Sequence, residues 1–415
     1  MRIVFRNPWW VVFGGVTGLI VCNGPVLAFT FGVFLKPIMA DMGWQRGTAS
    51  GALAVGEFLA AFAVPVYGRM MDRWTIRKVA LPGIVAFAAF LCLMGATPHS
   101  LVIFTILFTL TSIAGAVQTP LGYTKAISAW FDRRRGLALG CAMAGVGIGG
   151  MIVPQLANYL IAQLGWRGAY MVLGGLVLVI AFPAVGLFVR EPQPGEGERH
   201  DAHAATLPGL TPREAVATPS FWLLAATFFF VAMALLGSSA HVVPLLTDRG
   251  MSPAAATATF GLFGLSTMTG RLVSGYLIDR IFAPYIASVF WLAPIGGFFL
   301  LMGGSGLLPG LGVVMIGLGL GTEVDLIAFM ISRYLGLKAF GALYGLFFTA
   351  FSIGGAVGRF LGGYLFDIAG SYNVALMGAG GTLAVAVILI NRLGPYAYPI
   401  HRPATPALAA EPVVL

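Results

Sequence analysis

Long apolar stretches, separated by short polar segments, follow one another along almost the whole chain of 415 residues. Most are near the roughly 20 residues that a helix needs to cross the hydrocarbon layer of a membrane. The chain does not show the apolar and polar alternation over about ten residues that is typical of membrane-spanning strands. The pattern therefore predicts an all-α membrane protein with twelve transmembrane helices. Their approximate ranges are 9–36, 48–67, 79–95, 101–129, 137–163, 168–189, 219–246, 254–278, 284–303, 309–332, 340–365 and 373–392.

Two similar polar segments lie about half a chain apart. The first is the basic segment YGRMMDRWTIRK at 67–78, and the second is GYLIDR at 275–280. An offset of 207 residues links Gly68, Asp72, Pro37, Asp41 and Gly43 to Gly275, Asp279, Pro244, Asp248 and Gly250. An offset of 205 links Gly149, Gly150 and Tyr159 to Gly354, Gly355 and Tyr364. A duplication of six spans accounts for all these pairs together.

The segment between spans six and seven differs in composition from the spans, because it is rich in charged residues, Pro and Gly. We therefore expect an N-terminal six-helix bundle at 1–190, a cytoplasmic linker at 191–218, a C-terminal six-helix bundle at 219–393 and a disordered cytoplasmic tail at 394–415. The linker ends on Thr211-Pro212-Arg213-Glu214, which has the pattern of a helix N-cap, a proline at the first helical position and a capping-box glutamate. A short helix at the membrane surface is predicted there.

Charge is scarce and unevenly placed. Only 9% of the residues are charged, against about 25% in a soluble domain, and the formal net charge is +9. The basic residues that flank the spans fall mainly on one predicted side, and these include Arg69, Arg73, Arg77, Lys78, Arg133, Arg134, Arg135, Arg280, Arg333, Lys338 and Arg392. By the positive-inside rule both termini are cytoplasmic, in a multi-pass protein of the inner (plasma) membrane. Nucleic-acid binding is not expected, because these residues flank apolar spans instead of forming one basic face.

The segment after span two has the motif Gly-x-x-x-Asp-Arg followed by basic residues, and with it the chain resembles the major facilitator superfamily. Three further stretches are similar to the monocarboxylate transporters and the oxalate/formate antiporter. They are FGVFLKP at 31–37 with Gly43-Trp44, WFDRRRGLA at 130–138 and Gly270-Arg271-Leu272. The resemblance implies two six-helix bundles and alternating access around a central cavity. It also implies a gating role for Gly68, Arg69, Asp72 and Arg73 and for Gly275, Asp279 and Arg280.

Ionisable residues at membrane depth are costly and therefore candidates for function. Arg271 is placed about 12 Å into the membrane, eight residues before Asp279. Its planar guanidinium can hold a carboxylate at two points, and the resemblance implies substrate-anion binding at this position. Some of the similar transporters have an acidic residue one helical turn before this arginine, whereas this chain has Thr267 there. The residue that couples transport to protons is therefore not assigned by the resemblance. The alternative is that Arg271 pairs with Glu323 and only holds two helices together.

Three acids are candidates for proton coupling: Glu323, Asp325 and Glu57. Glu323 and Asp325 are two residues apart on a helix, so they point in directions about 200° apart and cannot both face a cavity equally. One can pair with a base while the other titrates, since burial and an adjacent cation act on a carboxyl in opposite directions. Glu57 lies mid-span, either in the cavity or facing a polar partner in span eleven.

The remaining candidates are less certain in orientation. Arg359 in span eleven is a second candidate for substrate binding, and with Arg271 it would suit a dicarboxylate; the alternative is that it reaches the membrane surface. Lys125 lies near the cytoplasmic end of span four and can do the same. The resemblance implies uncharged cavity residues on spans one, four and seven. These substrate-binding candidates are Asn23, Gln118, Tyr123 and His241.

The chain has no Gly-rich loop of the ATP-binding type and no Cys/His cluster for a metal, so we expect no cofactor and no enzymatic activity. We predict a secondary active transporter for a small organic anion, a mono- or dicarboxylate, coupled to protons or a counter-anion. It would act as a monomer in the lipid bilayer. Two alternatives stay open: an efflux transporter for drugs or metabolites, and a transporter-like membrane sensor of a metabolite.

Overall fold

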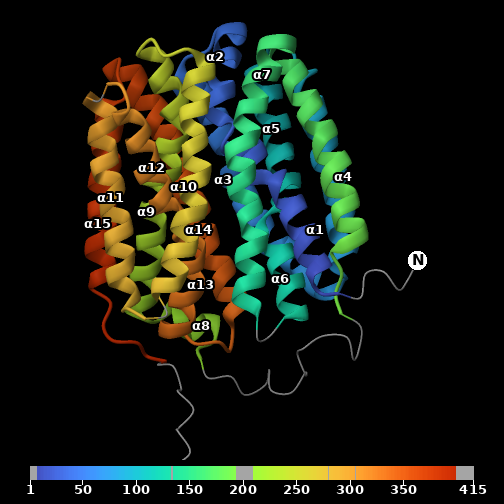
Figure 1. Ribbon diagram of the computed structural model, residues 1–415, viewed down its shortest axis with the longest axis vertical. Coiled ribbons are helices and arrows are strands. Elements are labelled where there is room, and N and C mark those ends of the chain that lie inside the picture. The colour runs from blue at the N-terminus through green and yellow to red at the C-terminus, as the bar shows by residue number, and fades with distance from the viewer. Residues whose placement is uncertain (1–6, 132–133, 193–208, 279, 304, 399–415) are drawn as a thin grey trace, which may run out of the picture.

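The computed structural model describes residues 7–131, 134–192, 209–278, 280–303 and 305–398, and almost all of them are helical. The long helices lie side by side along the longest axis of the molecule (Figure 1). We call the end that carries the loop after α2 the upper end, and the end that carries α6 and α8 the lower end, as the molecule is drawn in Figure 1.

The first half of the chain, called the N half below, contains seven α-helices and three short π- or 3₁₀-helical segments. Their bounds are α1 Trp9–Ile20, η1 Gly24–Ala28, α2 Phe31–Met42, α3 Arg46–Arg73, α4 Ile76–Met94, α5 Leu101–Gly115, η2 Ala116–Gln118, α6 Pro120–Trp130, α7 Arg135–Pro183 and η3 Ala184–Phe188. The second half, the C half, follows a short helix, α8 Pro212–Val216. Its helices are α9 Pro219–Asp248, α10 Pro253–Ile278, α11 Ala283–Gly303, α12 Leu308–Gly321, α13 Glu323–Tyr334, α14 Phe340–Ala369 and α15 Asn373–Asn391.

These helices form the twelve predicted spans, in two six-helix bundles. Within the described ranges, ten helical stretches are long and apolar enough to cross a membrane. One of them, Leu137–Phe188, contains spans five and six, which meet at Gly165, and the 26-residue α10 supplies the remaining span. The predicted fold class, an all-α membrane protein with twelve membrane-spanning helices, agrees with the described residues.

Three spans are interrupted, although the sequence pattern presented each as one apolar stretch. Span one consists of α1, η1 and α2 and runs to Met42, beyond its predicted end at 36. Span four is broken between η2 and α6, where Thr119 is extended because Pro120 follows it. Span ten is divided at Thr322 into α12 and α13. Three of the predicted site residues lie at these interruptions: Asn23 in span one, Gln118 in span four and Glu323 in span ten.

The structure agrees with an internal duplication. Gly43 after α2 and Gly250 after α9 both have positive φ angles, of 70° and 88°, which a residue with a side chain rarely adopts. In the N half, Gly149 lies against the backbone oxygen of Ile20, so span five packs closely on span one. In the C half, Gly354 lies against the backbone oxygen of Phe229, so span eleven packs in the same way on span seven.

The two halves meet along two long helix pairs, and α2 also packs against α9. The helix α3 packs along α14, with Gly51 against Phe360, and α7 packs along α10, with Gly147 against Met268. Glycines at these positions let the helix backbones approach closely, as is usual between membrane helices.

The predicted capping box before span seven is confirmed. The Thr211 hydroxyl accepts a hydrogen bond from the Glu214 N–H at 3.3 Å, and the Glu214 carboxylate accepts one from the Thr211 N–H at 2.8 Å. These bonds to Thr211 hold the pKa of the Glu214 carboxyl below its usual range. Most of the predicted linker (193–208) and tail (399–415) lies outside the described residues, so the proposed domain bounds stay a prediction.

Candidate functional site

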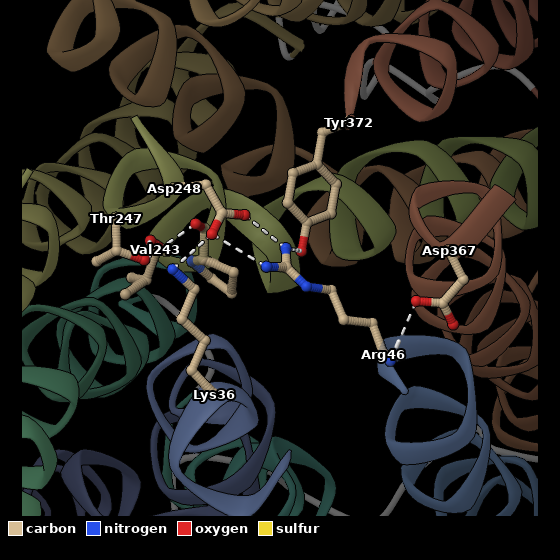
Figure 2. Close-up of polar contacts among 8 residues, drawn as sticks. Lys36, Arg46, Val243, Thr247, Asp248, Asp367 and Tyr372 are labelled. Carbon is tan, nitrogen blue, oxygen red and sulfur yellow. Dashed lines mark hydrogen bonds and ion pairs between the residues drawn. The ribbon is translucent and has the colours of Figure 1, made fainter. Parts of the chain in front are cut away.

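Three groups of charged side chains lie at or between the halves, at different depths. The first is at the upper end (Figure 2), where Asp248 at the end of α9 contacts two cations of the N half. Lys36 Nζ lies 2.6 Å from Asp248 Oδ1. Arg46 donates two hydrogen bonds to the same carboxylate, from Nη1 to Oδ2 at 2.6 Å and from Nη2 to Oδ1 at 3.0 Å. This geometry is the two-point contact for which a guanidinium is suited.

Asp367 of α14 makes a second contact across the halves, to the beginning of α3. Its carboxylate accepts hydrogen bonds from the backbone N–H of Arg46 at 3.2 Å and of Gly47 at 2.6 Å. The N-cap residue of this helix, Gln45, makes no capping bond with its own side chain. An acid from the C half therefore satisfies the free N–H groups and the positive dipole end of a helix in the N half.

Tyr372 and Phe366 complete the upper group around Arg46, which is only 9% exposed. The Arg46 guanidinium donates to the Tyr372 hydroxyl at 2.7 Å and lies over the Phe366 ring, 3.7 Å from its centroid. All the residues that hold the Arg46 side chain belong to the C half. We call Lys36, Arg46, Asp248, Asp367 and Tyr372 the upper bridge.

The second group is an ion pair deep in the bundle. Glu57 of α3 lies 11 residues below Arg46, about 16 Å along the helix, and accepts a hydrogen bond from Arg359 of α14. Arg359 is 3% exposed, so it does not reach the membrane surface. The structure thus resolves two alternatives: Glu57 faces a polar partner in span eleven, and that partner is Arg359. The imidazole of His241, on α9, contacts the same turn of α14, with Nε2 2.9 Å from the backbone oxygen of Arg359.

The third group surrounds Arg271 near the break in span ten. Arg271 is 9% exposed, and its Nη1 lies 3.8 Å from Asp325 Oδ1, which is an ion pair but too long for a hydrogen bond. Glu323 is fully buried, and neither carboxylate oxygen has a hydrogen-bond partner among the described residues. The alternative that paired Arg271 with Glu323 was therefore wrong in its partner, because Asp325 is the acid in contact.

Arg271 Nη1 also has no hydrogen-bond partner in the described part of the chain. A buried donor and two buried acceptor oxygens without partners are unusual, since most buried polar groups in proteins are satisfied. Such groups mark a place where a ligand, a proton or water completes the arrangement. The Arg271 group is therefore the strongest candidate for a binding site.

The predicted uncharged residues are placed in two different regions. Tyr123 is buried against Gly18 of α1 and donates a hydrogen bond to Gln118 Oε1 at 2.6 Å. Asn23 lies at the break in span one, where its buried Oδ1 has no partner among the described residues, and the same holds for Gln118 Nε2 at the break in span four. His241 instead lies in the C half beside α14. The uncharged candidates are therefore divided between the halves: Asn23, Gln118 and Tyr123 lie in the N half, and His241 lies in the C half.

The predicted gating residues lie at the lower end, as expected from their loops. Arg69 and Arg73 are exposed, and Gly68 lies against Leu121 of α6. Arg280 lies over the Tyr276 ring at 3.6 Å and donates to the Tyr276 backbone oxygen. Among the described residues, no side chain or backbone atom from another part of the chain packs against Gly275. Asp279 and the side chain of Asp72 lie outside the described residues. The gating role stays a prediction.

Lys125 was expected near the lower end of span four. Its Nζ donates to the backbone oxygen of Met71, in the last turn of α3, at 2.6 Å. It therefore contacts a helix end inside the N half.

The match to known families supports the architecture directly. The model of the Major Facilitator Superfamily matches residues 17–358, which is most of the chain. The chain belongs to this superfamily. Its similarity to individual transporters is lower: it is 26% identical over 359 residues to monocarboxylate transporter 13 of Bos taurus, covering 85% of this chain and 82% of that protein. It is 25% identical over 339 residues to monocarboxylate transporter 11 of Homo sapiens, covering 77% and 69% of the two chains.

Solved structures with a similar fold are also transporters. A point mutant of the nucleoside transporter NupG superposes with a TM-score of 0.72 at 13% identity, covering 93% of this chain and 99% of that one. A bacterial homologue of the human lysosomal transporter Spinster, in an inward-facing and occupied conformation, gives 0.67 at 15% identity, covering 92% and 95%. At such identities the likeness shows the fold alone. The family match makes this chain a multi-pass membrane transporter of a small molecule.

Sequence reasoning did not find the upper bridge. Lys36 and Arg46 were not among the predicted site residues, and Asp248 entered only as a member of the repeat. One signal was present, because a basic residue at the first position of a helix, as Arg46 is in α3, opposes the helix dipole unless an acid is nearby. That acid, Asp367, is 321 residues away in the sequence.

Proposed function

We propose that this transporter moves a small organic anion, a mono- or dicarboxylate, across the inner membrane by alternating access, with both termini in the cytoplasm. The observation that carries the proposal is Arg271, a buried guanidinium whose Nη1 makes no hydrogen bond to the described residues. A carboxylate offers two acceptor oxygens with the spacing that a guanidinium requires. The carboxylate class is also supported by the similarity to proteins that are named monocarboxylate transporters.

The charges around Arg271 bear on coupling. One base lies beside two acids, Asp325 at 3.8 Å and the buried Glu323. If both acids were ionised, the group would carry a net negative charge and would repel an arriving anion. Binding an anion at Arg271 therefore calls for a proton on one of these acids, or for the departure of another anion. We infer coupling to protons or to a counter-anion on this ground.

Arg359 has a different role in the state that the structure describes. Glu57 already balances its charge, so it is not free to hold a substrate carboxylate. We propose that Arg271 anchors a monocarboxylate and that Arg359 takes part in binding only when Glu57 is neutral. A second carboxylate on the substrate would then find a second cation, which accounts for a dicarboxylate.

The test is uptake by the purified protein in proteoliposomes, with radiolabelled lactate, oxalate and an aromatic acid, each with and without an inward proton gradient. We expect saturable uptake of at least one carboxylate, which the Arg271→Ala variant loses by about a hundredfold. Arg271→Lys should restore only part of it, because an ammonium cannot contact both oxygens at once. Arg392→Ala, which removes an exposed arginine beyond α15, is the matched control and should transport normally.

Each negative result has a separate meaning. Extrusion of lipophilic cations without uptake of any carboxylate would favour the efflux transporter. Carboxylate binding without any net movement across the vesicle membrane would favour the metabolite sensor. Normal uptake by Arg271→Ala would leave carboxylate transport in place but remove Arg271 from its site.

A further inference from the structure

The chain continues beyond α15 beneath the lower end of the C half, where it is drawn in red (Figure 1). Residues 394–398, which we call the tail strap, contact the C half at two places. The first is the beginning of α11, where the Tyr396 hydroxyl accepts a hydrogen bond from the Ala283 N–H at 2.9 Å. The second is the end of α13. The strap therefore connects α11 to α13 at the lower end.

Two hydrogen bonds join the strap to the last turn of α13, one from each end of the strap. The Tyr334 hydroxyl donates to the Gly394 backbone oxygen at 2.7 Å. The Tyr398 N–H donates to the Arg333 backbone oxygen at 2.8 Å. The last four carbonyl groups of a helix have no partner within that helix, so the strap satisfies one of these groups in α13.

The side chain of Tyr396 lies between these two bonds and contacts three other rings. Its ring centroid is 5.5 Å from that of Tyr334 and 6.1 Å from that of Phe329, both on α13. It is 4.9 Å from that of Phe282, which precedes α11. Aromatic pairs at such distances stabilise a structure beyond the burial of their surface. Tyr396 is therefore the side chain through which the strap holds α13.

The segment before α8 contacts the same end of α13. The Leu210 N–H donates to the Leu335 backbone oxygen at 2.9 Å, and Gly209 pairs with Gly336 in an antiparallel bridge. The segments that precede and follow the helices of the C half are thus both attached where α13 ends. This arrangement fixes the lower end of one short helix from two sides.

The position of α13 matters because this helix carries Asp325. Asp325 is nine residues before Tyr334, about 14 Å along the helix. At the other end, α12 is fixed on α10, since Gly321 lies against the backbone oxygen of Thr267, one turn before Arg271. The direction that α13 takes from this fixed point depends on where its lower end is held. That direction determines where the Asp325 carboxylate lies relative to Arg271.

We propose that the tail strap holds α13 in the position that places Asp325 beside Arg271, and that Tyr396 is a positioning residue for this site. The role in transport rests on the proposed function, in which Asp325 competes with the substrate carboxylate for the guanidinium. Release of the strap lets α13 move, which weakens the contact between Asp325 and Arg271. Arg271 is then more available to the substrate.

The hold on α13 can be measured by hydrogen–deuterium exchange of the full-length protein in detergent micelles, without substrate. Tyr396→Ala removes the ring contacts and the hydroxyl, so we expect the amides of 323–335 to exchange about tenfold faster. The amides of α12 should exchange as in the wild type, which shows that the bundle is folded. Tyr398→Ala is the matched control in the same strap and should leave α13 unchanged, because Tyr398 contacts α13 through its backbone N–H.

Tyr334→Phe tests the strap from the side of α13 and is a milder change than Tyr396→Ala. It keeps the ring and removes only the hydrogen bond to Gly394. We expect exchange in α13 to be about threefold faster than in the wild type. Unchanged exchange in α13 in both Tyr396→Ala and Tyr334→Phe would overturn the proposal.

Carboxylate uptake in proteoliposomes tests the positioning role. We expect the KM of Tyr396→Ala to fall by about threefold, whereas a general loss of structure would lower the maximal rate by reducing the amount of active protein. In the Asp325→Asn background, Tyr396→Ala should leave the KM unchanged, because the competing carboxylate is already gone.

Two outcomes of the uptake experiment would overturn the positioning role. One is faster exchange in α13 with an unchanged KM, and the other is an equal fall in KM with and without Asp325. Absence of uptake of any carboxylate by the wild type would be a failure of the proposed function alone. The exchange experiment needs no substrate, so it would still decide whether the strap holds α13.

Discussion

Arg46 and Asp248 form a two-point ion pair between the halves, with Nη1–Oδ2 and Nη2–Oδ1 distances of 2.6 and 3.0 Å. The residue that corresponds to Asp248 in the internal repeat is Asp41, which has a different task. Its carboxylate contacts Arg167 and Trp166, both in its own half. Asp41 therefore stabilises contacts within the N half, whereas Asp248 forms contacts between the two halves.

Asp248→Asn should open the upper end. The substitution removes the negative charge that Lys36 and Arg46 share, so the bridged state loses its main electrostatic contact. We expect the distance between spin labels at Ala40 and Ala254, one in each half, to shift toward longer values by several ångströms. The measurement is the distance distribution by pulsed electron paramagnetic resonance on the reconstituted protein.

Asp41→Asn is the matched control for this prediction, because it makes the same chemical change at the equivalent position of the repeat. Asp41 forms an ion pair with Arg167, so the substitution also removes one charge from a contact. Its partners lie in the same half, and the distance between the labels should stay that of the wild type. A shift of equal size in both variants would contradict the assignment of Asp248 to the upper bridge.

Asp367→Ala should weaken the upper bridge through the beginning of α3. The variant leaves the N–H groups of Arg46 and Gly47 without their acceptor, and loss of a helix cap costs about 1 kcal/mol. We expect a lower midpoint of thermal unfolding together with a longer distance between the labels at the upper end.

A second substitution separates these two effects. Gln45→Asp places an acid at the N-cap of α3, where no capping bond from the side chain of that residue exists in the structure. Combined with Asp367→Ala, it should restore the unfolding midpoint but not the distance between the halves. If both readouts recovered together, Asp367 would be a helix cap without a role in holding the halves.

The buried pair Glu57 and Arg359 should show strong energetic coupling. Removing one partner leaves an uncompensated charge inside the bundle, so Glu57→Leu and Arg359→Met should each cost about 3 kcal/mol of unfolding free energy. The double variant should be closer to the wild type than either single variant, because no charge is left unpaired. The measurement is a double-mutant cycle of unfolding in mixed micelles. The exposed pair Asp41 and Arg167 is the control, with an expected coupling below about 1 kcal/mol.

The spans, the duplication and the cap of α8 could be predicted because they depend on residues close in sequence or on a fixed offset. The pairing of Glu57 with span eleven was also one of two predicted alternatives, since a mid-span acid needs a partner and few bases lie at membrane depth. Hydropathy and the positions of the few charged residues predict much of a membrane protein, because a charged side chain at membrane depth needs a polar partner.

The upper bridge could not be predicted in the same way. It joins Arg46 to residues 202 and 326 positions away, and such contacts depend on which end of the transporter is closed. The partner of Arg271 was missed for a local reason. Glu323 and Asp325 are two residues apart on α13, so their side chains point in different directions, and the sequence alone does not say which of the two faces Arg271.

The contact between Arg271 and Asp325 leads to the last prediction, which concerns coupling. Asp325 competes with a substrate carboxylate for the guanidinium, because its Oδ1 lies 3.8 Å from Nη1. Asp325→Asn removes this competitor, so we expect the KM for carboxylate uptake to fall by about fivefold. Uptake by the variant should also lose its response to an inward proton gradient, since the acid that the proton neutralises is gone. Glu323→Gln is the comparison at the neighbouring acid; if it alone abolished the proton response, Glu323 would be the coupling acid and Asp325 only a structural partner of Arg271.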